Sequence, residues 1–194
     1  MKRKAVFLDR DGVINRLVLN PATGAYESPH TAAELSIFPF AAKSLKKLAD
    51  SGYLLFLVSN QPSYAKGKTS MENILAVHNK LDLYLKANGV DFTEYFYCYH
   101  HPYGQIPEYT CQCRCRKPSP FFLKFAAKKH LLDLTLSWMV GDQDSDIFCG
   151  QGGGVKTILV KEKHSAPKRG KSFPDYTARN LAEAAQIILD FKNP

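Results

Sequence analysis

The sequence predicts an α/β protein with a Rossmann-like, mostly parallel sheet and helices on both of its faces. Three continuous apolar runs, each followed by a small polar or acidic residue, alternate with stretches whose apolar residues recur at helical spacing. The chain has 194 residues, so residues 1–194 are expected to form a single domain with a sizeable core. Its 45% hydrophobic and 23% charged residues are ordinary for a globular protein and exclude disordered and fibrous classes.

The apolar runs predict strands over 5–8, 53–58 and 138–140, and weaker strand signals cover 95–99 and 157–160. Helical periodicity predicts helices over 41–50, 71–88, 120–130, 144–150 and 181–191. Two irregular stretches remain as predicted loops, 20–39 over the site and 98–118 around the cysteines. Ligands of such folds gather beyond the carboxyl ends of the strands, so the polar residues that follow the apolar runs should converge.

The charge balance is basic, with a formal net charge of +8 and a pI near 9.2. A positive field suits nucleic acids, anionic surfaces or small anionic substrates. We expect a small anionic substrate and no nucleic acid, because no aromatic residues interleave with a basic stripe. A mild basic cluster is interpreted as solvated surface: Lys161, Lys163, Lys168, Arg169 and Lys171.

The first apolar run ends at Leu8, which is too early for a secretion signal, and no uncharged run approaches the length of a membrane span. We therefore expect a cytoplasmic, monomeric protein with no membrane association.

The first strand is followed by two carboxylates, Asp9 and Asp11. Residues two apart in extended chain point the same way, and paired carboxylates are costly unless a cation lies between them, which indicates a divalent ion. Asp9 can then attack phosphorus while Asp11 acts as general acid and base. The alternative is an ordinary turn with helix-capping residues.

Polar and charged residues that could bind a phosphoryl group or a cation also follow the other predicted strands and the cysteine-rich loop. The Ser59 hydroxyl and the Asn60 amide suit phosphoryl oxygens, although Ser-Asn-Gln-Pro is also common loop chemistry. Lys117 supplies a cation that could neutralise a transferring phosphoryl group, although most lysines are solvated surface. Three acids between 141 and 146 suit a hard cation, and the competing use is capping of the following helix by Asp144 or Ser145.

Four of the five cysteines fall within 98–115, which favours a metal site over disulfides. Cys-x-His and Cys-x-Cys pairs match a closed, tetrahedral structural zinc site that would brace residues 98–118 and aim Arg116 and Lys117 at the substrate. The predicted ligands are Cys98, His100, Cys113 and Cys115. Spacing alone leaves His101 and Cys111 open as replacements, and chance clustering is the alternative reading.

Together these motifs resemble the haloacid-dehalogenase-like (HAD) phosphatase superfamily, whose four motifs appear in order: Asp9-x-Asp11, Ser59, Lys117 and Gly141-Asp142-x-x-Ser145-Asp146. The resemblance implies the HAD fold with a minimal cap, Asp9 as nucleophile and Asp11 as general acid and base. It implies that Ser59 and Lys117 hold the phosphoryl oxygens. It also implies Mg²⁺ bound by Asp9, the backbone carbonyl of Asp11 and Asp142, with Asp146 supporting the site from outside the ligand shell.

Within the superfamily, the order Cys-x-His, Cys-x-Cys, Arg-Lys-Pro and the opening 9–15 are similar to heptose-bisphosphate phosphatases and the related histidinol phosphatases. That resemblance selects Cys113 and Cys115, and the long stretch between His100 and Cys113 resembles the heptose group. It implies hydrolysis of the C7 phosphate of D-glycero-D-manno-heptose 1,7-bisphosphate for nucleotide-activated heptose and lipopolysaccharide synthesis. Arg116 would hold the second phosphate, and Asn60 and Tyr26 would contact substrate.

One segment departs from the family pattern, which usually continues after Asn-Gln with Ser-Gly-Ile-Ala-Arg-Gly, whereas residues 62–67 read Pro-Ser-Tyr-Ala-Lys-Gly. Because this segment borders the substrate, the rival hypotheses are a histidinol-phosphate phosphatase or another small sugar-phosphate phosphatase. More distant alternatives are a nucleic-acid end phosphatase and a non-catalytic, zinc-braced binding protein.

Overall fold

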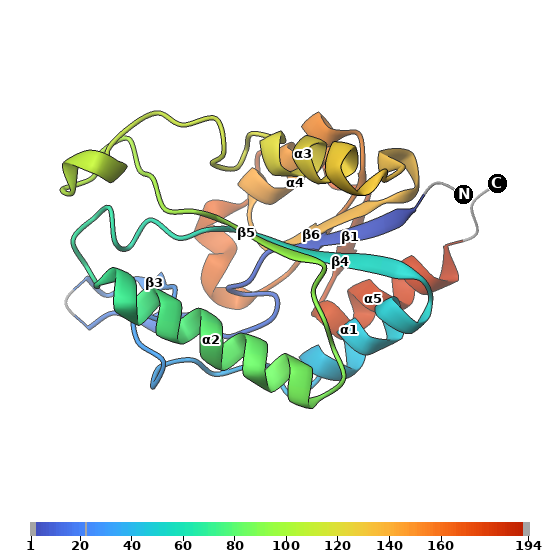
Figure 1. Cartoon of the computed structure of the whole chain (residues 1–194), viewed down its shortest axis with the longest axis horizontal. Coiled ribbons are helices and arrows are strands. Elements are labelled where there is room, and N and C mark those ends of the chain that lie inside the picture. Colours follow the sequence, from blue (N-terminus) through green and yellow to red (C-terminus); the bar gives the residue numbers. More distant parts are fainter. Residues whose placement is uncertain (1–2, 22, 192–194) are drawn as a thin grey trace.

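Six parallel strands form the central sheet of the computed structural model, which describes residues 3–21 and 23–191 (Figure 1). The sheet order is β5-β4-β1-β6-β7-β8, and each neighbouring pair is parallel. The strands are β1 (Lys4–Leu8), β4 (Tyr53–Asn60), β5 (Glu94–Cys98), β6 (Trp138–Gly141), β7 (Lys156–Val160) and β8 (Tyr176–Ala178). The predicted fold class is therefore confirmed.

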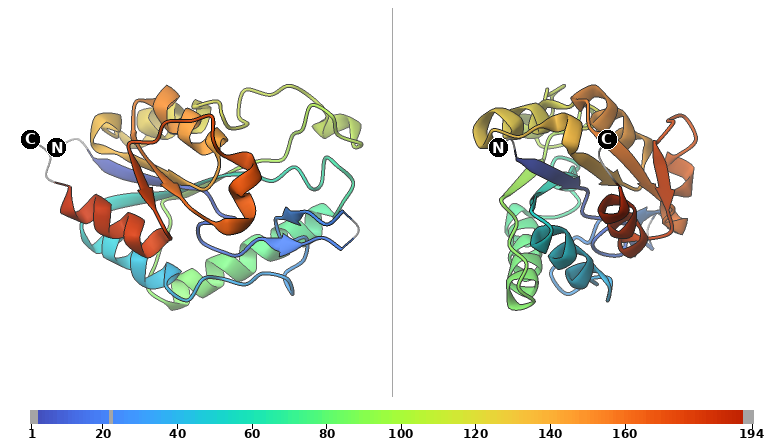
Figure 2. Two further views of the ribbon diagram at one scale, coloured as in Figure 1. Left: turned by 180° about the vertical axis from the view of Figure 1, so that it is seen from behind. Right: turned by 90° about the vertical axis from the view of Figure 1, so that its right-hand side faces the viewer.

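Helices cover both faces of this sheet (Figures 1 and 2). One face carries α1 (Ala41–Asp50), α2 (Met71–Ala87) and α5 (Leu181–Asp190), and the other carries α3 (Phe121–His130) and α4 (Asp144–Gly153). Successive residues of β1 enter opposite cores: Val6 and Leu8 pack with the first group, and Ala5 and Phe7 with the second. The central strands are thus buried on both faces, which explains their continuous apolar runs.

The predicted strands and helices are confirmed to within a few residues. The structure adds short elements that the sequence did not indicate: a hairpin of β2 (Val18–Leu19) and β3 (Tyr26–Glu27), strand β8, and the 3₁₀ helices η1 (Pro107–Tyr109), η2 (Leu134–Leu136) and η3 (Lys163–Lys168). The expectation of an unstructured loop over 20–39 is wrong at β3. Strands of two or three residues are too short to show a periodic pattern. The single-domain organisation stays a prediction.

Within the described residues, no helix combines the length and apolar character needed to span a bilayer.

The sheet has its topological switch point at β1, which lies between β4 and β6. Crevices at such points are the usual ligand sites of open α/β sheets. In Figure 1 the carboxyl ends of these strands point to the left, toward the hairpin and the long loop that follows β5. The fold therefore brings the ends of β1, β4 and β6 together with two irregular segments.

We predict that Gly150→Ala destabilises the protein, because α4 lies so close to the sheet that an added Cβ would meet Thr157 at 2.6 Å and Met139 at 2.8 Å. Overpacking of this kind costs about 1–3 kcal/mol. The matched control is Gly152→Ala in the same helix, where the nearest atom is 3.3 Å away on Pro120. Urea denaturation should show a lower midpoint for Gly150→Ala only; equal midpoints would contradict the close approach of α4.

Candidate active site

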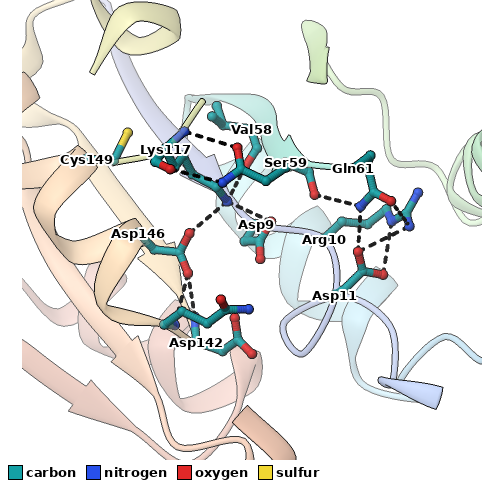
Figure 3. A network of polar contacts seen from close by, with 12 residues as sticks. Asp9, Arg10, Asp11, Val58, Ser59, Gln61, Lys117, Asp142, Asp146 and Cys149 are labelled. Atoms are coloured by element: carbon teal, nitrogen blue, oxygen red, sulfur yellow. Dashed lines mark hydrogen bonds and ion pairs between the residues drawn. The ribbon is translucent and has the colours of Figure 1, made fainter. Parts of the chain in front are cut away.

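The buried ammonium group of Lys117 joins the ends of β1 and β4 to the first turn of α4 (Figure 3). Its Nζ lies 2.8 Å from Asp9 Oδ1 and 2.7 Å from Asp146 Oδ1, and it donates to the Val58 carbonyl at 2.7 Å. Burial lowers the pKa of Lys117, but the two carboxylates outweigh burial and hold it above its ordinary value. Lys117 is therefore a fixed positive charge beside the predicted nucleophile.

Asp9, Asp142 and Asp146 form a buried acidic cluster whose carboxylate oxygens lie within 4.8 Å of one another. Burial, Asp9 and Asp146 together raise the pKa of Asp142 well above its ordinary value. Burial also raises the pKa of Asp9 to about 6, against the opposing effect of Lys117. Three carboxylates thus share one ammonium group, which leaves the cluster short of positive charge.

The cluster fits a hard divalent cation. Neither carboxylate oxygen of Asp142 has a hydrogen-bond partner among the described residues, and such oxygens are the ligands that Mg²⁺ prefers. A Cβ at Gly12 would collide with this carboxylate, so the glycine, at φ +85°, allows the loop after β1 to approach Asp142. One carboxylate oxygen of Asp9 and one of Asp142 lie within 4.8 Å of each other, which is close enough to share an ion, and their role as ligands stays a prediction. The predicted third ligand, the Asp11 backbone carbonyl, stays a prediction.

Asp146 has a different role from its two neighbours. Its Oδ2 accepts hydrogen bonds from the backbone N–H groups of Asp142, at 3.1 Å, and Gln143, at 3.0 Å, in the capping box that starts α4. Asp146 therefore fixes the end of β6 and the position of Lys117. The capping of α4 predicted for Asp144 or Ser145 instead involves Gln143 and Asp146.

The side chain of Asp11 points away from Lys117 into a network of donors (Figure 3). Arg10 donates to both carboxylate oxygens of Asp11 at 3.1 Å. The Asp11 carboxylate also accepts hydrogen bonds from Gln61 at 2.6 Å, Asn15 at 2.8 Å and Ser28 at 2.9 Å. Burial raises the pKa of Asp11, but Arg10, Asn15 and Gln61 hold it below its ordinary value. Asp11 is thus an oriented, ionised carboxylate at the edge of the cavity.

Ser59 and Asn60, which were predicted to contact phosphoryl oxygens or the substrate, form hydrogen bonds within the protein. The hydroxyl of the buried Ser59 accepts from Gln61 at 3.0 Å and does not line the cavity. Asn60 does line it, yet its side-chain amide pairs with the Lys117 backbone, accepting at 3.0 Å and donating at 3.1 Å. In this structure Ser59 and Asn60 position their neighbours.

The four predicted zinc ligands come together at the end of β5 and in the loop that follows it. Their sulfur atoms are 3.3–3.4 Å apart, and His100 Nδ1 is 3.5 Å from the Cys115 sulfur. A zinc tetrahedron with bonds of about 2.3 Å has edges of about 3.8 Å, so the cluster of Cys98, His100, Cys113 and Cys115 is compact enough to hold one ion. Cys111 is exposed and His101 Nδ1 accepts from the Tyr103 backbone, so both lie outside the cluster.

A cavity of about 480 Å³ opens above the acidic cluster. It is large enough for a sugar phosphate. Tyr26 lines it and stacks on His164, with the ring centroids 3.5 Å apart. Arg116 lines it too, and its guanidinium donates to the His100 carbonyl at 3.3 Å. Lys168, an exposed member of the basic cluster that was interpreted as solvated surface, also lines this cavity.

The comparisons with known proteins agree with this geometry. A family model described as "HAD-hyrolase-like" matches residues 114–184. The D-glycero-beta-D-manno-heptose-1,7-bisphosphate 7-phosphatase of Pasteurella multocida is 34% identical over 98% of this chain and 100% of its own length. The chain belongs to this family of HAD-like heptose-bisphosphate phosphatases.

Further family members show the same match. The D-glycero-alpha-D-manno-heptose-1,7-bisphosphate 7-phosphatase of Photorhabdus laumondii is 36% identical over 84% of this chain and 85% of its own length. The solved D,D-heptose 1,7-bisphosphate phosphatase of B. bronchiseptica, complexed with magnesium and phosphate, aligns with a TM-score of 0.79 at 24% identity, covering 96% of this chain and 98% of that one. This chain and that protein therefore share the same fold.

Two residues that orient the site, Arg10 and Gln61, were not predicted from the sequence. Both are buried and orient Asp11, and Gln61 also holds Ser59. Arg10 stands between the two aspartates and Gln61 directly follows Ser59-Asn60, so proximity to the motifs is the signal that could have identified them.

We predict that Mg²⁺ raises the thermal unfolding midpoint more at pH 8 than at pH 5. The pKa of Asp9 rises on folding from 3.8 to about 6, so without a cation the folded chain binds the extra proton and loses stability as pH rises through this window. A bound cation replaces the proton. We expect a shift of about 4 °C at pH 8 and under about 1 °C at pH 5 in scanning calorimetry. Asp142→Asn should reduce the shift; equal shifts at both pH values would contradict this assignment.

We predict that the cysteine cluster binds about one zinc ion per chain. Cys113→Ser should lose most of the metal in elemental analysis, because it removes one of four ligands. Cys111→Ser is the matched control, because this cysteine is exposed and outside the cluster, and it should keep the metal. Equal metal content in both variants would exclude the proposed ligand set.

Proposed function

We propose that this protein hydrolyses the C7 phosphate of D-glycero-D-manno-heptose 1,7-bisphosphate and leaves the C1 phosphate in place. The observation that carries the proposal is the buried arrangement of Asp9, Lys117 and the acidic cluster on the floor of a cavity that Lys66, Arg116 and Lys168 also line. The names of the family relatives support this substrate. Because those names include both the alpha and the beta form, the proposal covers both anomers.

In the first step, a carboxylate oxygen of Asp9 attacks the phosphorus at C7, and the bond between phosphorus and the sugar oxygen breaks. The negative charge of the bound phosphate raises the pKa of Asp11, so Asp11 carries a proton for this step and gives it to that oxygen, which leaves as the C7 hydroxyl. In the second step, water attacks the aspartyl phosphate, Asp11 accepts the proton of the water, and inorganic phosphate leaves. The hydrogen bonds that keep Asp11 ionised favour its role as base in the second step.

Lys117 supports both steps, because its fixed ammonium group lies 2.8 Å from the attacking carboxylate and offsets the charge of the incoming phosphoryl oxygens. Mg²⁺ would be held by Asp9, Asp142 and the backbone carbonyl of Asp11, where it would offset the remaining negative charge. Ser59 is proposed to hold phosphoryl oxygen once Gln61 releases its hydroxyl. Asn60, Arg116 and Tyr26 are proposed to contact the substrate.

Zinc in the cysteine cluster would serve structure alone, since all four ligand positions are taken by the protein. It would fix the loop that carries Arg116 and Lys117. The product, a heptose 1-phosphate, would enter nucleotide-activated heptose synthesis for surface glycans such as lipopolysaccharide. The monomeric state and the cytoplasmic location stay predictions.

The proposal predicts magnesium-dependent release of one phosphate from the heptose bisphosphate and at least about a hundredfold slower release from histidinol phosphate. Asp9→Asn should abolish release because the amide is not a nucleophile. Asp50→Asn, which changes an exposed aspartate paired with Lys46 on α1, is the control and should keep full activity. Acid-quenched wild-type protein should carry phosphate on the peptide that contains Asp9, as mass spectrometry would show. Turnover by Asp9→Asn would exclude covalent catalysis.

A further inference from the structure

Two aromatic rings from distant parts of the chain stack beside the cavity. The ring centroids of Tyr26, on β3, and His164, in η3, lie 3.5 Å apart with an angle of 17° between the ring planes. Of the described residues, Tyr26 lines the cavity and His164 does not. His164 can therefore act on a ligand in the cavity only through Tyr26.

The hairpin that carries Tyr26 depends on contacts outside itself. Its two strands have two residues each, and an isolated two-stranded hairpin is at best marginally stable. The two residues that follow Tyr26 are bonded to other segments, since Glu27 pairs with Lys68 at 2.6 Å and the Ser28 hydroxyl donates to Asp11 at 2.9 Å. These contacts hold the chain next to Tyr26, and the stack with the imidazole holds the Tyr26 ring itself.

The segment that carries His164 is anchored to the acidic floor of the site. The Glu162 carboxylate caps η3 by accepting from the backbone N–H groups of His164, at 2.5 Å, and Ser165, at 3.1 Å. The buried Ser165 hydroxyl donates to the Asp142 carbonyl at 3.2 Å. His164 is consequently a fixed support for the ring that stacks on it.

A side chain that is ordered before binding is a better contact for a ligand than a mobile one. Without a neighbouring ring, a tyrosine on a two-residue strand can adopt several rotamers, and a ligand that packs on it must order it at a cost in affinity. The negative face of an aromatic ring attracts the polarised C–H groups of a sugar, and the phenol can exchange hydrogen bonds with sugar hydroxyls. The stacked Tyr26 ring is therefore suited to a sugar.

We propose that His164 is a positioning residue that holds the Tyr26 ring in the orientation that binds the sugar of the substrate. This inference rests on the proposed function and deepens it, because the pair acts on the sugar and not on the phosphate that is removed. The reacting groups lie apart from the pair, since Asp9 and Lys117 are buried on the floor, only 5% and 3% exposed. Loss of the stack should therefore weaken sugar binding and leave the chemical step unchanged.

The kinetic test compares His164→Ala, His164→Gln and His164→Phe on two substrates, the heptose 1,7-bisphosphate and acetyl phosphate, which has no sugar. For the bisphosphate we expect KM to rise about fivefold for the alanine and glutamine variants, which lack a ring, and to stay within about twofold for the phenylalanine variant, which keeps one. In all three variants kcat for the bisphosphate and KM for acetyl phosphate should change by less than about twofold. Lys163→Ala, at an exposed position of η3 outside the cavity lining, is the matched control and should leave both substrates unaffected.

The same measurements can overturn the inference. A fall in kcat as large as the rise in KM, or an equal rise in KM for acetyl phosphate, would show that His164 only supports the structure. Failure of His164→Phe to restore KM would exclude ring stacking as the cause.

Two further measurements separate this inference from the proposed function. In NMR spectra the imidazole proton signals of His164 should move downfield in Tyr26→Leu, which removes the ring current, and stay in place in Tyr26→Phe. Calorimetric titration of Asp9→Asn protein with the bisphosphate should show an affinity that falls about fivefold when His164→Ala is added. Such binding without turnover by the wild-type protein would support the inference and reject the phosphatase assignment. Wild-type turnover with binding that does not depend on His164 would overturn the inference alone.

Discussion

The ion pairs of Lys117 are the interactions on which the rest of the site depends. One ammonium group contacts two buried carboxylates, Asp9 and Asp146, and a third, Asp142, lies beside them. Loss of one partner from a buried pair costs about 3–5 kcal/mol, because a charge is left unpaired away from water. One lysine cannot neutralise three acids, so the same constraint that makes Lys117 indispensable also creates the need for a cation. The excess negative charge of the cluster and the need for a cation thus both follow from the placement of three carboxylates around one ammonium group.

Lys117 does not lie on the sheet, so its position depends on the loop that carries it. Asn60 at the end of β4 holds the Lys117 backbone through two hydrogen bonds, at 3.0 and 3.1 Å. Cys113 and Cys115, two of the proposed zinc ligands, come shortly before it in the chain. The backbone hydrogen bonds of the parallel sheet position Asp9 and Asp142 at the ends of β1 and β6. Among the described residues, the irregular loop that carries Lys117 has no such hydrogen bonds to a neighbouring strand, and it needs a further constraint. The proposed closed metal site would supply that constraint and would couple the cysteine cluster to the acidic cluster around Asp9.

Periodicity and strand ends were enough to predict the sheet, the five helices and the convergence of the acidic residues, because each depends on local pattern and on one topological rule. The rest depends on long-range geometry. Nothing local indicates that the Ser59 hydroxyl is held by Gln61, or that Lys168 reaches the cavity whereas Lys163 does not. The two-residue strands of the hairpin leave no periodic signal, although one of them positions Tyr26. The sequence thus predicts the acidic residues of the site better than the residues that line the rest of the cavity.

Charge divides the cavity: the buried carboxylates form its floor, and its mouth carries Lys66, Arg116 and Lys168, for which no ion pair is found among the described residues. The floor lies on strand ends whose geometry the sheet enforces, whereas the mouth lies on loops that tolerate change. The segment that departs from the family pattern, 62–67, belongs to the mouth. There Lys66 keeps the positive charge of the usual arginine but not its planar, bidentate fork, which leaves Arg116 as the fork-bearing cation. Substrate choice can consequently change at the mouth while the reaction on the floor stays the same.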